Sequence, residues 1–222
     1  MSFVKTIIVL DKNVDIQNTK KIIEILLNKA DLMRNLFFSE GVLDVLNHAS
    51  DKALYGSKLG IDLTSKIEGE ETSTVKLENN SKKILPAPET ILSKFTELVS
   101  CKILEQKGLH HVAFVTLKKI SPQQGPKLIE KFMKDEESSS ITIFIVLEEQ
   151  ENINDTSTVV WKILNNIDPK RDMHFFGNRV GIDVTCKTGE NSYTQHWPDE
   201  IEMSEKIKSI VDLKWMNMFH ES

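Results

Sequence analysis

The feature that most constrains the fold of this chain is an internal repeat that includes polar as well as apolar residues. At an offset of 137 residues, Val9–Asp11 lies over Val146–Glu148, and Arg34 pairs with Arg171. Shared apolar residues are common between buried strands, but shared charges are not, so chance is a poor explanation. The sequence therefore predicts one supersecondary unit that occurs twice. The same offset pairs Ile16 with Ile153, Thr19 with Thr156, Leu27 with Leu164, Asn28 with Asn165, Asp31 with Asp168 and Phe38 with Phe175.

A second matching segment extends the repeat. Tyr55–Lys66 lies over Phe176–Lys187 at an offset of 121 residues, with six of twelve positions identical. The offset is smaller by 16 because the first copy contains an insertion over about residues 39–54. Gly56 and Gly177 are expected to be turn glycines at the start of this segment.

Hydrophobic periodicity predicts the elements of both copies. A helix between two buried strands indicates a parallel crossover, which is right-handed by the usual rule. We therefore expect an α/β fold in which duplicated β-α-β units form mixed, mainly parallel sheets, or one continuous sheet, flanked by helices. The predicted strands are 6–10, 36–38, 58–64, 111–117, 141–147, 173–176 and 179–185. One predicted helix ends near residue 30, and the others cover 89–106, 126–134, 156–167 and 204–218; one or two helical turns are expected at 42–48.

The repeat also divides the chain. We expect a first repeat unit over residues 1–70, an acidic and polar linker plus helix over 71–106, and a second, more complete unit with a C-terminal helix over 107–222. The linker assignment depends on residues 68–83, which are rich in acidic, Ser, Thr, Asn and Lys residues and poor in large apolar ones.

Composition excludes several classes of function. The formal net charge is −5 and the charges are well mixed, so no basic stripe supports nucleic-acid binding. No apolar run approaches the ~20 residues of a membrane span. Cys101 and Cys186 are the only cysteines, which suits a reducing cytoplasm and gives no zinc spacing. His48, His110 and His111 form no triad pattern and are expected to be surface or internally satisfied histidines.

The repeated polar side chains are the candidate site residues. Strand alternation places Asp62 on the same face as Gly60 and Thr64. Such a carboxylate would hold a neighbouring loop through backbone N–H groups, or it would serve as a ligand or base; its presence in both copies favours the structural role. Lys58 shares the face, so charge pairing within each copy is expected. The second copy presents Arg179, Asp183 and Thr185 at the corresponding positions.

Two further features concern helix ends and surfaces. Asp31 and Arg34 are three residues apart, as are Asp168 and Arg171, which suits a local ion pair or a C-cap at a helix end. The last helix has an apolar stripe, and we expect it to pack on the sheet or on a partner subunit. Its interface candidates are Trp215, Met216 and Met218.

Three segments of the second copy match the motifs of one known domain. Phe114–Gly125 resembles a strand that ends in a Lys-Lys-x-x-Pro-like turn. Val160–Asp172 resembles a W-A-x-x-T-R-x-D-P-x-R-D segment, and Gly177–Lys187 resembles G-S-K-M-G-I-D-A-T-x-K. The second copy thus resembles the C-terminal domain of the UbiD family of aromatic-acid decarboxylases, from about His111 to Met218. Departures occur after the last motif, where the family's Pro-Gly-Glu is replaced by Ile67–Glu70 in the first copy and Thr188–Glu190 in the second.

The resemblance implies a parent enzyme that performs non-oxidative decarboxylation on prenylated FMN with a divalent metal, in the branch associated with quinone biosynthesis. It also implies that the flavin site and its Glu and Arg catalytic groups lie in domains upstream of this one, with Met1 an internal methionine. No catalytic, cofactor-binding or metal residue is therefore assigned to this chain. We expect a non-catalytic region that self-associates, with a dimer as the first expectation, and that meets the upstream catalytic domains. The alternative is a free-standing interaction or small-ligand-binding protein derived from this domain.

Overall fold

The structure, a computed structural model, describes residues 3–67, 70, 84–104, 109–189, 193–199 and 203–219, the last four of these by backbone only. The predicted linker at 68–83 lies almost wholly outside these ranges. The elements in chain order are β1 (Thr6–Val9), α1 (Thr19–Lys29), β2 (Leu36–Val42), β3 (Tyr55–Asp62), α2 (Pro88–Lys94), β4 (Leu98–Ile103), β5 (Val112–Leu117), α3 (Gln124–Met133), β6 (Ile143–Glu148), α4 (Thr156–Asn166), α5 (Pro169–Asp172), β7 (Met173–Phe176), β8 (Arg179–Asp183) and α6 (Glu205–Phe219).

The strands form two separate mixed sheets. One has three strands in the order β1-β3-β2, and the other has five in the order β4-β5-β6-β8-β7. Pairs β1/β3, β5/β6 and β6/β8 are parallel, whereas β2/β3, β4/β5 and β7/β8 are antiparallel. The predicted α/β fold with mixed sheets flanked by helices is confirmed, with parallel pairing making up half of the described ladders.

Strand order and register are the same in the two repeated segments. Val9 lies opposite Asp62 in the parallel ladder of the small sheet. Val146 lies opposite Asp183 in the corresponding ladder of the large sheet. The antiparallel ladders correspond as well, with Phe38 opposite Leu59 and Phe175 opposite Val180. A one-residue slip would exchange the two faces of a strand, so equal register means that corresponding side chains face the same way.

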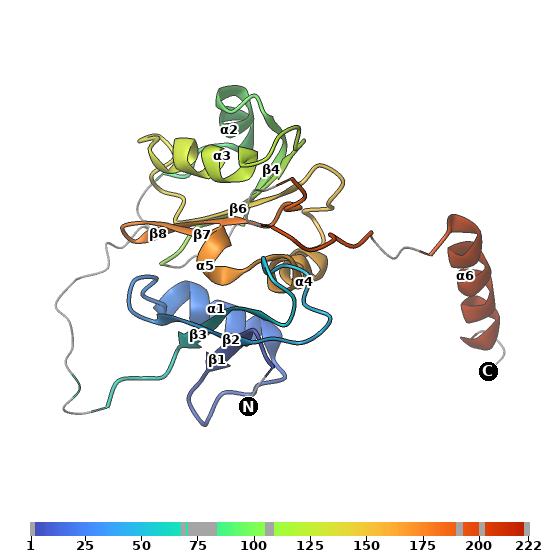
Figure 1. The fold of residues 1–222 in the computed structure, drawn as a ribbon, viewed down its shortest axis with the longest axis horizontal. Helices are drawn as coiled ribbons and strands as arrows, with labels where there is room; N and C mark the ends of the chain where they lie inside the picture. The colour runs from blue at the N-terminus through green and yellow to red at the C-terminus, as the bar shows by residue number, and fades with distance from the viewer. Residues whose placement is uncertain are drawn as a thin grey trace.

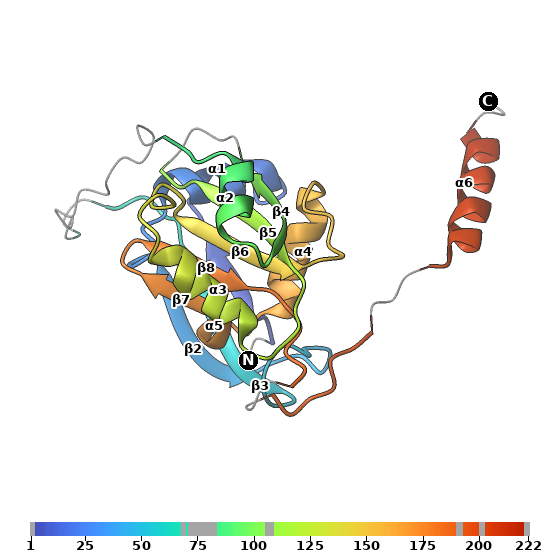
Figure 2. The ribbon, with the colours of Figure 1, turned by 90° about the horizontal axis from the view of Figure 1, so that it is seen from above.

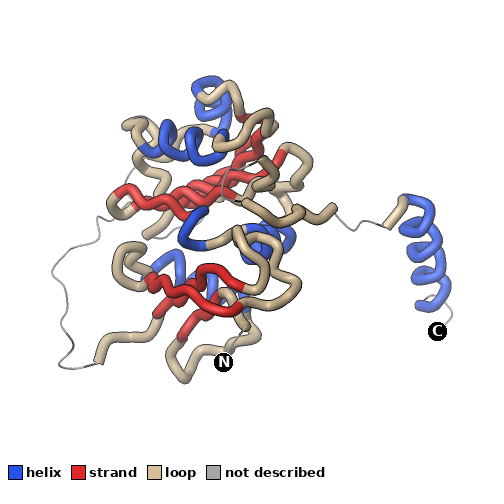
Figure 3. Tube along the Cα trace, viewed as in Figure 1, coloured by secondary structure: helices blue, strands red, loops and turns tan. Residues whose placement is uncertain are grey.

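The elements stack in four layers (Figure 1). Helices α2 and α3 cover one face of the large sheet, and α1, α4 and α5 lie between its other face and the small sheet. Figure 3 shows the same arrangement, with two groups of strands separated by helices. Among the described elements, helices therefore cover the small sheet on its inner face only.

Side-chain alternation divides the core between these layers. In β5, Val112 and Phe114 point into the core shared with the small sheet, whereas Ala113 and Val115 point toward α3. Both faces of this strand are buried, which explains its continuous apolar run. Leu59 and Ile61 of the small sheet belong to the same core as Val112 and Phe114. The two repeated units thus share one hydrophobic core.

One predicted helix is wrong. The segment expected to be helical over 89–106 contains a short helix, α2, and then the edge strand β4, which pairs antiparallel with β5; residues 105 and 106 lie outside the described residues. Backbone N–H and C=O groups at the open edge of β5 need partners, and β4 provides them. The spacing of apolar residues within the segment does not show that the edge of β5 needs hydrogen-bond partners.

The insertion also differs from the prediction. Residues 43–50 form turns and bends instead of helical turns. The carboxylate of Asp44 accepts a hydrogen bond from the backbone N–H of Leu46, 2.9 Å away, as in an Asx turn. Leu43 is fully buried and anchors the segment. Local side-chain hydrogen bonding competes here with helix formation.

The last helix stands away from the body. Figures 1 and 2 show α6 separate from both sheets. Trp215 on this helix is 63% exposed. The side chains of the other interface candidates, Met216 and Met218, lie outside the described ones. Among the helices described, none combines the length and apolar character needed to cross a membrane.

Candidate functional site

The two repeated aspartates make the same local contacts. Asp62 Oδ1 accepts hydrogen bonds from the backbone N–H of Thr64 at 3.0 Å and from its hydroxyl at 2.6 Å. Asp183 Oδ1 accepts the corresponding bonds from Thr185 at 3.1 and 2.7 Å. Each carboxylate therefore fixes the turn that ends its own strand. These bonds also lower the pKa of the Asp62 carboxyl.

The two sites differ in burial. Asp183 is 1% exposed and lies beneath α3, where it also accepts a 2.7 Å hydrogen bond from Lys187 Nζ. Burial alone would raise the pKa of Asp183, but the charge of Lys187 and the hydrogen bonds outweigh it and hold that pKa below its ordinary value. Lys187 is itself buried and lies 3.5 Å from Asp172. Burial raises the pKa of Asp172. Asp183, Lys187 and Asp172 thus form a buried charged cluster.

Arg179 does not pair with Asp183 as expected from the shared strand face. Its guanidinium donates to three backbone carbonyl oxygens, those of Met133, Ser138 and Ile141, at 2.7, 2.8 and 2.9 Å. The loop that follows α3 exposes these carbonyls, and a planar guanidinium satisfies all three. Lys187, the last residue of the repeated segment, takes the role of cation for the aspartate.

The segment Asp168–Asp172 joins the second unit to the first. The carboxylate of Asp168 accepts hydrogen bonds from the hydroxyl of Ser57 and, at 3.1 Å, from its backbone N–H. Gly56 lies close to the same carboxylate, because a Cβ at position 56 would come within 2.8 Å of Asp168 Oδ2. Gly56 is therefore a close-approach glycine within β3, whereas Gly177 has the positive φ of a turn.

Arg171 extends this junction. Its guanidinium donates to Asp51 at 2.5 Å and to Asp172 at 2.7 Å, and it also reaches the carbonyl of Ala49. The local pair predicted with Asp168 is thus replaced by contacts across the two units. In the first copy, Arg34 does lie 3.8 Å from Asp31, as predicted. The sequence did not indicate the junction, because Asp51 lies in the insertion, which has no counterpart in the second copy.

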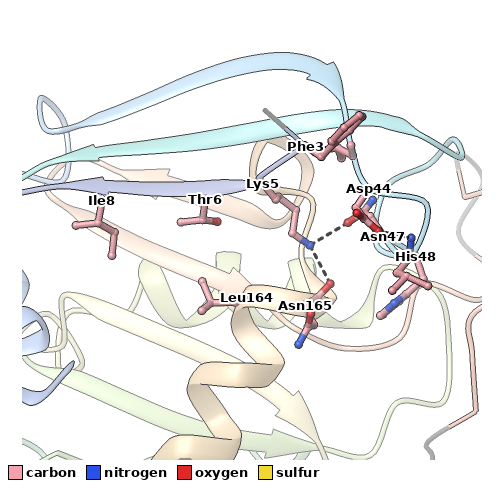
Figure 4. A pocket seen from close by; sticks show the side chains of 11 residues that line it. Phe3, Lys5, Thr6, Ile8, Asp44, Asn47, His48, Leu164 and Asn165 are labelled. Carbon is pink, nitrogen blue, oxygen red and sulfur yellow. Dashed lines mark hydrogen bonds between the residues drawn. The ribbon is translucent and has the colours of Figure 1, made fainter. Parts of the chain in front are cut away.

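A cavity of about 450 Å³ opens beside this junction, between the small sheet and α4. Figure 4 shows Lys5 reaching into it toward Asn47 of the insertion and Asn165 of α4. Lys5 Nζ donates to Asn47 Oδ1 at 3.1 Å and to the carbonyl of Asn165 at 2.9 Å. Thr6 and Ile8 project toward the same cavity. Nothing in the repeat indicated Lys5.

Lys5 is the most perturbed base of this cavity. Burial lowers its pKa to about 8, although the charges of Asp168 and Asp172 raise it in part. A substantial neutral fraction near pH 8 would let the amine accept a proton or bind a polar ligand. His48 lines the same cavity, and burial lowers its pKa too. The lining of the cavity therefore combines hydrogen-bond donors, an amine with a lowered pKa and the carboxylate of Asp44.

His110 and His111 are internally satisfied, and metal ligands are dispersed. His110 lies within 2.6 Å of the carbonyl of Ala30, and His111 Nδ1 lies 3.1 Å from the carbonyl of Ser140. Within the described ranges, no group of three or more His, Cys, Asp or Glu side chains could hold a metal ion. Most polar side chains of the site thus form hydrogen bonds or ion pairs with one another or with the backbone.

The shared core, the strand order and the junction segment Asp168–Asp172 define the class: an α/β region in which two similar units share one hydrophobic core. The chain belongs to the family of the 3-octaprenyl-4-hydroxybenzoate carboxy-lyase C-terminal domain, which it matches over residues 1–63 and 83–195. The predicted family is confirmed, and the match includes the first repeated unit as well as the second.

The curated relatives that the chain matches are distant. An uncharacterized protein of Helicobacter pylori (strain ATCC 700392 / 26695) is 29% identical over 208 residues, which are 93% of this chain and 32% of the relative. A relative from Archaeoglobus fulgidus is 27% identical over 136 residues, 54% of this chain and 28% of its own length. The chain thus spans about a third of the length of the curated relatives it matches.

Two solved structures resemble the fold. The vanillic acid decarboxylase of Sedimentibacter hydroxybenzoicus covers 60% of this chain, with 31% of its own chain, at 10% identity and a TM-score of 0.45. The UbiD-class enzyme HmfF from Pelotomaculum thermopropionicum, in an evolved dimeric form in complex with prFMN, covers 54% of this chain, with 26% of its own, at 18% identity and a TM-score of 0.43. At these sequence identities, the similarity concerns the fold alone.

Proposed function

We propose that this chain is the C-terminal, non-catalytic region of a UbiD-type aromatic-acid decarboxylase, and that it serves in self-association and in closing the active site of the larger enzyme. The observation that carries the proposal is the family match, combined with repeated charged residues that hold turns and join the two units. We place the parent enzyme in quinone biosynthesis, in line with the substrate named by the family, and in the cytoplasm, in line with the presence of only two cysteines in this chain.

The cofactor implied for the parent enzyme does not fit the residues of this region. A flavin phosphate needs a glycine-rich helix N-terminus or a similar cradle of N–H groups. Gly125 at the start of α3 is the nearest equivalent, but a Cβ there would lie 2.5 Å from Asp183 Oδ1, so a carboxylate already occupies the space. Prenylated FMN and the divalent metal are therefore assigned to the upstream catalytic domains.

Decarboxylation also needs an electron sink for the developing carbanion, which a cofactor normally supplies. We therefore expect the purified chain to bind no flavin and to release no CO₂ from 4-hydroxybenzoate or vanillate. The measurements are the visible absorbance of the protein after incubation with FMN and the CO₂ released. A yellow protein would show that the chain binds flavin, and substrate-dependent CO₂ release would show that it is catalytic; either result would contradict the proposal.

Self-association is tested separately by light scattering coupled to gel filtration at tens of micromolar protein. We expect a dimer, because twofold assemblies dominate among soluble homo-oligomers and several large apolar side chains are exposed. A monomer at these concentrations would remove self-association from the proposal and leave the rest intact.

The cavity beside Lys5 favours a second candidate, a small-ligand-binding role derived from the same domain. Its amine and amide donors would suit a small carboxylate. Trp197 reports on the site, because its ring centroid lies 4.8 Å from that of His48. Benzoate should change the tryptophan fluorescence of the native protein and not that of a Lys5→Met variant. An equal response of the two proteins would eliminate this candidate.

A further inference from the structure

Strand β1 is an edge of the small sheet. Within the described part of the chain it pairs with β3 only, whereas its counterpart β6 lies between β5 and β8. Ile7 and Val9 are each 49% exposed and Ile8 is 38% exposed, but Ile145, the counterpart of Ile8, is only 5% exposed. An apolar strand edge of this kind is a template for pairing with another strand.

The ladder with β3 fixes which backbone groups face this edge. The carbonyl oxygen of Lys5 accepts a hydrogen bond from the backbone N–H of Leu59, at the start of the β1/β3 ladder, at 2.9 Å. Successive residues of a strand direct their N–H and C=O groups to opposite sides. The backbone groups of Thr6 and Ile8 therefore face away from β3.

The second unit shows how the corresponding groups are paired. The backbone N–H of Ile143, the counterpart of Thr6, donates to the carbonyl of His111 at 3.1 Å. From there β5 runs parallel to β6 along the whole ladder, and all six residues of β5 are buried. In the large sheet, a parallel apolar strand thus occupies the position that lies beside β1 in the small sheet.

The cavity beside Lys5 marks the place where such a strand would begin. In the second unit, His110 enters there: its backbone N–H donates to the carbonyl of Leu27 at 3.0 Å, and its ring lies 3.2 Å from Thr142 Oγ1. The counterparts of Leu27 and Thr142 are Leu164 and Lys5, which both line the cavity (Figure 4). Leu27 is 3% exposed, whereas Leu164 is 45% exposed. The space that an incoming residue fills in the second unit is therefore accessible in the first.

The lining specifies the chemistry of a strand that fits. Ile8 and Leu164 make the inner side of the edge apolar, so alternate residues of the strand should be apolar too. At the start, the ammonium of Lys5 has three donors, and two of them go to Asn47 Oδ1 and the carbonyl of Asn165. A hydrogen-bond acceptor on the first residue of the strand can meet the third.

We propose that the edge of β1 pairs in parallel with an apolar strand from the catalytic part of the parent enzyme, and that the first residue of that strand places a hydrogen-bond acceptor in the cavity beside Lys5. This rests on the proposed function, which supplies the parent enzyme, and it names the surface where the two parts meet. The matched regions make up 32% and 28% of two curated relatives, so most of each relative lies outside them and can supply the strand. In strand addition of this kind, main-chain hydrogen bonds provide affinity and side-chain pockets provide specificity.

Peptide binding tests the proposal, and β5 supplies the probe. A peptide of residues 109–118 of this chain, with lysines added at both ends for solubility, is titrated against the whole 222-residue protein. Amide hydrogen exchange in β1 is followed by NMR. The amides of Thr6 and Ile8 should exchange rapidly without the peptide and at least tenfold more slowly with it. Those of Ile7 and Val9, which face β3, should change little.

Two N-methylated versions of the peptide form a matched pair with identical side chains. In β5, the N–H groups of Ala113 and Val115 face β6, whereas those of Phe114 and Thr116 face β4. Methylation at Ala113 and Val115 should weaken binding at least tenfold, because it removes two backbone hydrogen bonds to β1. Methylation at Phe114 and Thr116 should leave the affinity within about twofold.

Three results would overturn the proposal. One is the absence of binding at about 1 mM peptide. Another is an equal loss of affinity for the two methylated peptides, or protection that falls on a strand other than β1. The third is slow exchange of Thr6 and Ile8 in the protein without peptide, which would show that the edge is already paired within the chain or with a second copy. Flavin binding or CO₂ release by the chain alone would instead refute the proposed function, so the two failures are distinguishable.

Discussion

Replacing Asp183 with asparagine should destabilise the protein far more than the same change at Asp62. Both carboxylates accept two hydrogen bonds from the threonine two residues ahead. Only Asp183 is buried and paired with a buried lysine, Lys187, at 2.7 Å. Asparagine keeps the shape of aspartate and leaves the Lys187 charge without its closest counterion.

The magnitudes follow from these surroundings. Removing one partner of a buried ion pair costs about 3–5 kcal/mol, because the remaining charge is stranded in a poorly solvated site. Losing the charge on a solvent-facing carboxylate that holds a turn costs about 1 kcal/mol. For a chain of this size, each kcal/mol corresponds to roughly 2–4 °C in Tm, so Asp183→Asn should lower the Tm by roughly 6–20 °C.

Urea unfolding followed by circular dichroism measures both variants against the wild type at pH 7. The Asp183 pKa is depressed in the folded state, so its contribution is present above the unfolded pKa of about 3.9 and is lost as the pH falls through the lower, folded value. The difference between wild type and Asp183→Asn should therefore persist down to about pH 4 and shrink below it. Equal losses of stability for Asp62→Asn and Asp183→Asn would refute the buried-pair reasoning.

Two other predictions use the same internal comparison or the same pH logic. Gly181→Ala should cost about 1–3 kcal/mol by overpacking against Ile129, whereas Gly60→Ala should be nearly neutral; similar urea midpoints for the two variants would contradict this. The pKa of Lys5 is depressed to about 8 when folded, so the unfolded chain binds more protons between pH 8 and about 10.5, and this group makes stability rise with pH in that window. Relative to Lys5→Met, wild-type stability should increase from pH 8 to 10; a flat difference would show that Lys5 is not desolvated.

The equal register of the repeated ladders bears on the history of the chain. We propose that the two units arose by duplication and then diverged through what covers them. In the second unit, α3 closes the outer face, whereas none of the described residues covers that face in the first unit. The insertion between β2 and β3 has a separate role, because its residues Asn47 and Asp51 contact Lys5 and Arg171. An extra loop in one copy thus provides the junction between them.

The sequence by itself determined the repeat, most strands and the family. Strong apolar runs such as Ile143–Leu147 predict buried strands because both faces of a strand in a covered sheet must be apolar. The matched Gly-Ile-Asp segments predicted equal strand positions, and the ladders place Asp62 and Asp183 at equivalent points. The motifs of the second copy also indicated the domain family that the chain matches. These features depend on local pattern, which is present in the sequence.

Only the tertiary structure decided which equivalent residues are buried and which partners they have. Asp62 and Asp183 read alike in sequence, yet one faces solvent and the other pairs with Lys187 beneath α3. Arg179 binds carbonyls of a loop some 40 residues away, and β4 forms because the edge of β5 is open. Desolvation, ion pairing and edge pairing depend on which segments meet in space, and a local pattern does not contain that information.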